Sequence, residues 1–448
     1  MKQISFTARS GASIRYDVLL RQVQGYLAKE HAEAISRAET DEGLVKSYIG
    51  NYLKNEEIGV SGGTTQDAVD RIYQDTAGTG FLASYLNDLT KLEEININAW
   101  DDAVVTMADG SQHHAEGKFL SPEHADTILT RLVTTHKGLL DAASPAAKVT
   151  IAPNTRMTIV QAPIVDADIG FAASIRTVNT ASLSKQDLIR EGSATQDILD
   201  FIFFCVRHGV SVVFAGEPGS GKTTTCGLIL SMIPDRFRIV TLEHQTREFQ
   251  LRRRDENGRV LNDVVHMITR PSEKPEQNFD LIRLIALAKT FDPKIMAIGE
   301  IVGAEAFVAY IAAKSFRVVT TTHSLSAPDT YSELASLAKL HPDASGFSDE
   351  SLISAMTNAF PVVVYMKKLE DGSRRIMDVF EATGANGKQV LGNSLYRFKI
   401  TDNIEDEVNG KPVLRVVGRH EKVNSCSEHL QTVLLDNGAS RRDLERYV

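Results

Sequence analysis

The chain has 448 residues and a formal net charge of −9, and 42% of its residues are hydrophobic and 24% charged. This length predicts two or three domains, and this composition excludes a chain that is disordered throughout. The negative charge argues against nucleic acid or anionic lipid as the main partner, because phosphates repel an acidic surface. The three cysteines, Cys205, Cys226 and Cys426, lack metal-ligand or redox spacing and suit a reducing compartment.

The beginning of the chain lacks the apolar core of a signal peptide. No run of about 18 apolar residues is present that would predict a membrane-spanning helix. We therefore expect a cytoplasmic protein that reaches a membrane only through a partner.

The first half of the chain predicts helices followed by a mixed α/β region. Residues 15–60 have a helical pattern, with apolar residues at spacings of three and four. This core-facing stripe comprises Val18, Leu19, Val23, Tyr26 and Leu27. Residues 80–175 instead contain short strand-like runs, a hairpin signal at Asp109-Gly110 and a helical stretch at 122–135. We expect antiparallel strand pairs there.

From about residue 195 the pattern alternates between helices and strands. Four apolar, β-branched runs are typical of buried parallel strands and lie at 210–215, 239–242, 295–298 and 318–322. A later pair, 362–368 and 374–381, has the turn signal Asp371-Gly372 between its members. The sequence thus predicts an α/β fold with a mainly parallel sheet.

The segment after the first of these runs fits the phosphate-binding pattern G-x-x-x-x-G-K-[ST], and a helix can begin directly after it. Its backbone N–H groups and the positive end of that helix favour phosphate. Lys222 is expected to reach the β- and γ-phosphates of ATP, and the Thr223 hydroxyl to ligate Mg²⁺. The predicted nucleotide-binding residues are Gly216, Glu217, Pro218, Gly219, Ser220, Gly221, Lys222, Thr223 and Thr224.

Hydrolysis also needs a carboxylate that orients or activates water. Glu243 and Glu300 each follow a predicted buried strand, and His323 follows another. The carboxyl ends of parallel strands share one edge of the sheet, where the phosphate loop also lies. We therefore expect these three side chains near the nucleotide, with Glu300 contacting Mg²⁺ through water. A basic run at 252–254, followed by Asn257-Gly258, favours a solvated hairpin loop.

Several ordered motifs together resemble the type II/type IV secretion system ATPase family, the hexameric traffic ATPases, and the tight-adherence and conjugation branch in particular. The resemblance spans residues 80–385. It rests on Leu242-Glu243-His244, which resembles the family's Asp box, and on Ile298-Gly299-Glu300, which resembles its Walker B motif. It rests also on Thr321-Thr322-His323-Ser324, which resembles its His box. The chain departs from the family pattern at several positions. His244 and Lys294 each replace an acid, Val302 replaces an arginine, and one residue is inserted before Glu248. The His box lacks its usual upstream Gly-His, where Ser315-Phe316-Arg317 stand.

The resemblance implies an N-terminal mixed α/β domain followed by a RecA-like P-loop ATPase domain. It also implies ATP and Mg²⁺ as cofactors and a homohexamer. In such a ring, Arg156 and Arg176 of the smaller domain would clamp the γ-phosphate. The expected organisation is a helical region at 1–79, an α/β domain at 80–181, a linker at 182–194, an ATPase domain at 195–400 and an extension at 401–448.

The implied function is an ATP-hydrolysing motor for protein secretion, pilus assembly or conjugative transfer. It would act at the cytosolic face of the inner membrane, with membrane platform proteins as partners and no direct contact to nucleic acid. Two alternatives remain open. A nucleotide-sensing assembly scaffold would bind ATP with little turnover, and a nucleic-acid translocase would need a basic channel. The transported substrate, and extension as opposed to retraction of a pilus, are not encoded in any of these motifs.

Overall fold

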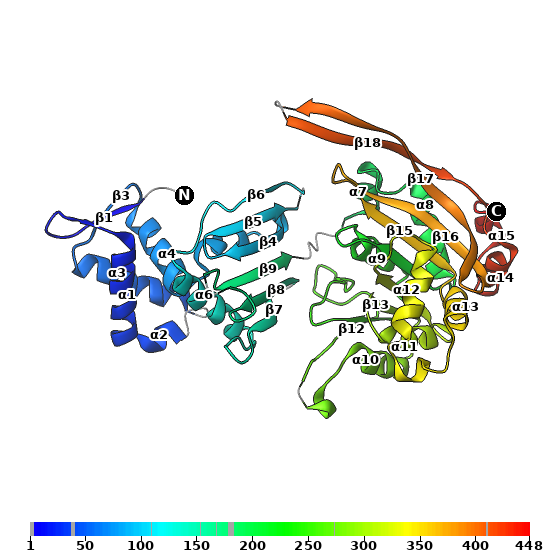
Figure 1. Ribbon diagram of the computed structural model, residues 1–448, viewed down its shortest axis with the longest axis horizontal. Helices are drawn as coiled ribbons and strands as arrows, with labels where there is room; N and C mark the ends of the chain where they lie inside the picture. The colour runs from blue at the N-terminus through cyan, green and yellow to red at the C-terminus, as the bar shows by residue number, and fades with distance from the viewer. Residues whose placement is uncertain are drawn as a thin grey trace. The chain divides into compact units, whose positions relative to one another are not determined.

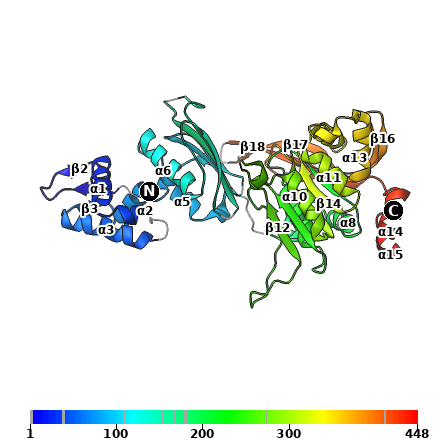
Figure 2. The ribbon, with the colours of Figure 1, turned by 90° about the horizontal axis from the view of Figure 1, so that it is seen from below.

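The computed structural model describes residues 4–36, 41–108, 110–152, 154–166, 168–177, 183–272, 274–408 and 411–448. The chain divides into two compact units, Met1–Asn179 and Thr180–Val448. Both are drawn in Figures 1 and 2, and each is described by itself.

The first part of unit 1 is helical with a small three-stranded sheet, β2-β1-β3. Leu19, Val23 and Leu27 are buried in its core, whereas Val18 is 37% exposed. The predicted apolar stripe is therefore correct at its centre and wrong at Val18. The elements are β1 (Ser5–Thr7), β2 (Ser13–Ile14), α1 (Tyr16–Glu30), α2 (Ala32–Ser36), α3 (Glu42–Asn55), β3 (Gly59–Ser61) and α4 (Thr65–Thr76).

The second part of unit 1 is a six-stranded antiparallel sheet in the order β6-β5-β4-β9-β8-β7. Helix α6 begins at Pro122 behind the capping hydroxyl of Ser121, and its apolar residues join the core of the sheet. The antiparallel pairing that we expected is present. The elements are α5 (Ala83–Leu86), β4 (Leu92–Ala99), β5 (Asp102–Met107), β6 (Gln112–His114), α6 (Pro122–Thr135), β7 (Ala146–Ala152), β8 (Thr155–Gln161) and β9 (Phe171–Thr177).

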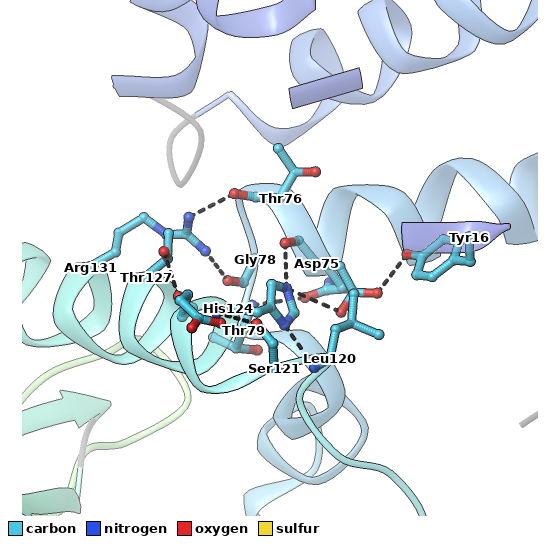
Figure 3. Close-up of polar contacts among 12 residues, drawn as sticks. Tyr16, Asp75, Thr76, Gly78, Thr79, Leu120, Ser121, His124, Thr127 and Arg131 are labelled. Atoms are coloured by element: carbon cyan, nitrogen blue, oxygen red, sulfur yellow. Dashed lines mark hydrogen bonds and ion pairs between the residues drawn. The ribbon is translucent and has the colours of Figure 1, made fainter. Parts of the chain in front are cut away.

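Polar contacts join these two parts of unit 1, as Figure 3 shows. Arg131 of α6 donates to the carbonyl oxygens of Thr76 and Gly78, just where α4 ends. His124 Nδ1 accepts from the Leu120 N–H, so the ring proton lies on Nε2, which donates to the Asp75 carbonyl oxygen at 2.8 Å. These bonds satisfy carbonyl groups that have no partner within the last turn of α4.

Unit 2 is built on a nine-stranded sheet in the order β12-β11-β13-β14-β10-β15-β16-β17-β18. The six strands from β12 to β15 pair in parallel, and β15 to β18 pair antiparallel. The mainly parallel sheet is thus confirmed. Its strands are β10 (Val212–Gly216), β11 (Ile239–Glu243), β12 (Val264–Ile268), β13 (Ile295–Ile301), β14 (Arg317–Thr322), β15 (Val362–Lys368), β16 (Arg374–Asn386), β17 (Gln389–Val408) and β18 (Lys411–Lys422).

Helices cover both faces of the parallel strands, and successive strand residues enter opposite cores. Val212 and Phe214 pack with α8 and α9, whereas Val213 and Ala215 belong to the core formed with α10 to α13. The helices are α7 (Lys185–Arg190), α8 (Gln196–Arg207), α9 (Lys222–Ser231), α10 (Leu281–Ala288), α11 (Glu305–Ala313), α12 (Asp329–Ala338), α13 (Asp349–Ala359), α14 (Glu428–Asp436) and α15 (Arg441–Leu444).

The end of the chain is part of unit 2. Strands β17 and β18 form a long antiparallel pair, drawn in orange in Figure 1, and β17 runs through residue 400. The chain then returns to the core, where Leu430, Leu434 and Tyr447 are buried beside α8. The boundary that we expected between 400 and 401 therefore lies inside a strand.

Cys205, Cys226 and Cys426 are buried free thiols. Within the described residues, no helix has the length and apolar character required to cross a membrane.

Candidate functional site

The phosphate loop joins β10 to α9. Gly216, Gly219 and Gly221 have φ angles of 146°, 74° and 93°, which side-chain-bearing residues rarely adopt. A Cβ at Gly216 would lie 2.0 Å from the carbonyl oxygen of Met366 on β15. Only glycine therefore permits β10 to end this close to β15 before the loop turns into α9.

Lys222, the first residue of α9, is 6% exposed and points back into this loop. Its Nζ donates to the carbonyl oxygens of Gly216 at 2.8 Å and Glu217 at 2.9 Å, and lies 3.4 Å from His323 Nδ1. The Ser220 Oγ is buried without a hydrogen-bond partner among the described residues. A buried ammonium and a buried orphan hydroxyl beside a helix N-terminus fit phosphate oxygens.

The remaining residues of the phosphate loop lie nearer the surface. Glu217 is half-buried and Pro218 exposed, while Thr223 is half-buried and Thr224 exposed at the start of α9. The described residues contain no cluster of three or more His, Cys, Asp or Glu side chains that could hold a metal. A Mg²⁺ ion held by the Thr223 hydroxyl and substrate phosphates needs no such cluster, so these residues fit that ion.

Glu300 and His323 come from neighbouring strands and meet beside the loop. The register of β13 against β14 shifts between Ile298 and Ile301, and such an irregularity re-aims a side chain. Glu300 Oε1 lies 3.0 Å from His323 Nε2. His323 Nδ1 lies 3.4 Å from Lys222 Nζ and 3.3 Å from the Gly216 carbonyl oxygen, so the ring bridges Glu300 and the phosphate loop.

Glu243 ends β11 and is only 1% exposed. Its Oε2 accepts from the N–H groups of Glu248 and Phe249, and its Oε1 accepts from the Thr241 hydroxyl at 2.9 Å. Burial raises the pKa of Glu243 to about 7. The side chain thus organises the loop that follows β11, and Phe249 of that loop is buried in the core shared with α9.

Two further residues contact the site and were not among the predicted site residues. Arg374 of β16 donates from Nε to the Gly219 carbonyl oxygen at 2.8 Å. Glu305 of α11 accepts from the N–H groups of Val302 and Gly303 and so fixes the chain directly after Glu300. Both contacts depend on strand and helix placement, which short motifs do not report.

Arg156 and Arg176 lie in unit 1, on β8 and β9. They are direct cross-strand partners, and the alternate positions Met157 and Ile175 face the core. The two arginines therefore share the face of the sheet opposite to the core.

Two of the positions that depart from the family pattern are open to solvent, since His244 is exposed and Val302 is 47% exposed. The basic run at 252–254 precedes a turn closed by hydrogen bonds between Asp255 and Arg259, and Arg254 pairs with Val260. Arg253 forms an ion pair with Asp235. These contacts agree with a surface hairpin loop.

A phosphate loop at the carboxyl edge of a mainly parallel, helix-covered sheet defines unit 2 as a RecA-like P-loop NTPase domain. Residues 147–360 match the family described as Type II/IV secretion system protein, the family that the motifs of this chain resemble. This match includes the phosphate loop, Glu243, Glu300 and His323.

Curated relatives match part of the chain. The chain is 27% identical over 189 residues to the type IV secretion system protein PtlH of Bordetella pertussis, which covers 41% of this chain and 54% of PtlH. It is 22% identical over 177 residues to the protein VirB11 of Agrobacterium tumefaciens strain 15955. That alignment covers 39% of this chain and 49% of VirB11. The matches thus span about half the length of these relatives.

Among solved structures, the chain is similar to the VirB11 ATPase of the Brucella suis type IV secretion system in complex with sulphate. The identity is 20% and the TM-score 0.36, over 70% of this chain and 96% of that one.

Proposed function

We propose that the protein is an ATP-hydrolysing motor that powers protein secretion, pilus assembly or conjugative transfer from the cytosolic face of the inner membrane. The convergence of Lys222, Glu300 and His323 at the phosphate loop carries this proposal. Three strand ends contribute to one polar site, as expected of a P-loop ATPase. The family match supports the same reading.

In the proposed reaction, the loop N–H groups and Lys222 hold the β- and γ-phosphates. Lys222 then exchanges its contacts with loop carbonyl oxygens and His323 for contacts with phosphate oxygens. Thr223 is the residue that would hold Mg²⁺, and Glu300 would contact it through water. That ion neutralises charge on the phosphate oxygens.

Two carboxylates are candidates to activate the water that attacks the γ-phosphate. Glu300 is half-exposed and paired with His323, whereas Glu243 is buried and fixed by three hydrogen bonds. We propose that Glu243 accepts the proton, because burial raises its pKa to about 7 and brings it near the working pH of a general base. Glu300 then orients the water.

Arg156 and Arg176 are proposed to clamp the γ-phosphate from unit 1 in an assembled ring. They are direct partners on β8 and β9, and Glu94 of β4 is the other register partner of Arg176. Each guanidinium can donate two hydrogen bonds to phosphate oxygens, which suits it to this role. The ring itself is proposed to be a homohexamer on inner-membrane platform proteins, and the resemblance to the secretion ATPase family supports this part of the proposal.

A nucleotide-sensing scaffold with little turnover is a second candidate. Val302 occupies the place of an arginine and is 47% exposed, so the chain brings no positive charge to that position. The scaffold predicts ATP binding by a hexamer that hydrolyses almost no ATP.

Steady-state ATP hydrolysis by the purified protein, sized by light scattering, tests the proposal. We expect Lys222→Ala and Glu300→Gln each to lower kcat on the order of 100-fold. Lys294→Ala, an exposed lysine before β13, serves as the control and should retain activity. Equal turnover in wild type and Lys222→Ala would refute the motor, and ATP binding by wild type without turnover would favour the scaffold.

A further inference from the structure

A buried chain of polar side chains lies behind Glu243. Thr241 precedes Glu243 by two residues on β11, so both side chains lie on the same side of the strand. His266 is the register partner of Thr241 on the neighbouring strand β12. Its Nδ1 lies 2.8 Å from the Thr241 hydroxyl, which is 2.9 Å from Glu243 Oε1. Thr241 is fully buried, and the His266 side chain is 8% exposed.

The number of hydrogens fixes the direction of these bonds. The Thr241 hydroxyl has one hydrogen, and it donates this hydrogen to Glu243. The contact with His266 must then be donated by the imidazole, from Nδ1. Burial lowers the pKa of His266 to about 4, helped by the charges of Arg247 and Arg252, so the ring is neutral. His266 Nε2 consequently carries a lone pair, and it is buried without a partner among the described residues.

These polar side chains hold Glu243 Oε1, whereas the backbone holds Oε2. Both N–H donors after β11 bind Oε2, and the Thr241 hydroxyl donates to Oε1. On the other side, a Cβ at Gly299 would lie only 3.2 Å from Glu243 Cγ. The carboxylate is thus confined between Thr241 and the chain just before Glu300.

Other ionisable groups near this chain act on its charge as well. Glu248 raises the pKa of Glu243 by repulsion, and Arg247 and Arg252 face His266 from the loop after β11. From α9, Cys226 faces Glu243, and burial with that carboxylate raises the pKa of its thiol. From β13, Gly299 contributes only backbone. Within this surrounding, Thr241 and His266 are the side chains that donate along the path to Oε1.

We propose that His266 is a positioning residue for ATP hydrolysis, which acts through Thr241 to fix Glu243 Oε1 and to favour the ionised carboxylate. The proposal rests on the proposed ATPase function and on Glu243 as the proton acceptor. A donor directed at Oε1 stabilises the charged form, so its loss makes the carboxylate a poorer base at a given pH. Thr241 donates to Oε1 and His266 acts through it, so removal of either residue changes the carboxylate in the same direction.

The test is the pH dependence of kcat for ATP hydrolysis by the full chain with Mg²⁺ and saturating ATP. We expect Thr241→Val and His266→Leu to lower kcat at neutral pH on the order of tenfold and to move the acidic limb of the profile upward by about one pH unit. KM for ATP should change less than about twofold, since neither residue contacts the phosphate loop.

Conservative variants separate positioning from packing. Thr241→Ser retains the hydroxyl, and His266→Asn places an amide N–H where Nδ1–H was, so both should restore the wild-type profile. Thr320→Val controls for a buried valine, because the Thr320 hydroxyl on β14 bonds only weakly to the Thr321 carbonyl oxygen at 3.3 Å. It should leave the profile unchanged. If Thr241→Val does not fold, a comparison of the pH profiles of His266→Leu and His266→Asn tests the proposal alone.

Active variants Thr241→Val and His266→Leu with wild-type pH profiles would overturn this proposal and leave the ATPase function standing. So would a profile shift in His266→Asn as large as that in His266→Leu, because a loss of packing would then explain both. A wild-type protein without turnover would remove the proposed function and this proposal together.

Discussion

The close approach of Gly216 to β15 makes a quantitative prediction about nucleotide binding. In Gly216→Ala the new Cβ would lie 2.0 Å from the Met366 carbonyl oxygen, a separation that real Cβ atoms do not show. Relief of this overlap moves β10 away from β15 and costs about 1–3 kcal/mol, as overpacking does elsewhere. The positive φ of 146° adds about 1–2 kcal/mol.

The loop conformation that binds phosphate therefore loses about 2–5 kcal/mol, and apparent affinity falls with the population of that conformation. We expect ATP binding by Gly216→Ala to be weaker by about 100-fold or more. Gly219→Ala is the matched control, since Gly219 has a φ of 74° and no atom within 4 Å of an added Cβ. Strain alone should cost this variant roughly tenfold.

Titration with a fluorescent ATP analogue, together with thermal unfolding of both variants, provides the measurement. Gly216→Ala should also unfold at a lower temperature, because β10 is central in the sheet. Affinities of the two variants within threefold of each other would refute the reasoning. Backbone strain would then account for the whole loss of ATP affinity, and the overlap with Met366 would contribute nothing to it.

Three further predictions concern other parts of the molecule. Arg374→Ala removes the hydrogen bond to the Gly219 carbonyl oxygen and should weaken ATP binding about fivefold to tenfold, measured by the same titration, with Arg374→Lys intermediate. Burial raises the pKa of Glu243 from 4.5 to about 7, so folding is favoured at low pH and that contribution is lost as pH rises through this window. Relative to wild type, Glu243→Gln should gain stability between pH 4.5 and 7, on the order of 3 kcal/mol, and thermal unfolding at both pH values checks the sign. Arg131→Ala leaves the carbonyl groups at the end of α4 without their donor, so limited proteolysis between α4 and α5 should become faster, whereas Arg21→Ala on the exposed face of α1 should not change it.

Sequence reasoning found the parts of the site that local order dictates. The phosphate loop is a contiguous pattern between a strand and a helix. Glu300 and His323 were predicted because each follows a buried parallel strand, and such strands end at one edge. The antiparallel pairs of unit 1 and the mainly parallel sheet of unit 2 were accessible for the same reason.

The rest depends on register and on the return path of the chain. The contact of His266 with Thr241 requires that β12 pair with β11 in one alignment, and no local pattern fixes that alignment. Arg374 reaches the loop only because β16 lies two strands from β10. Val18 was placed in the core because periodicity alone does not give the width of the buried stripe.

The return of the chain end to unit 2 changes how deletion experiments on this protein should be interpreted. The Tyr447 ring packs against Phe201 and Phe204 of α8, the helix that supports β10 and thus the base of the phosphate loop. A deletion of the last 48 or so residues, intended to remove a contact with a secretion partner, would also uncover an apolar face beside the nucleotide site. Loss of the proposed function in such a mutant would report an incompletely folded P-loop domain before it reported anything about a partner.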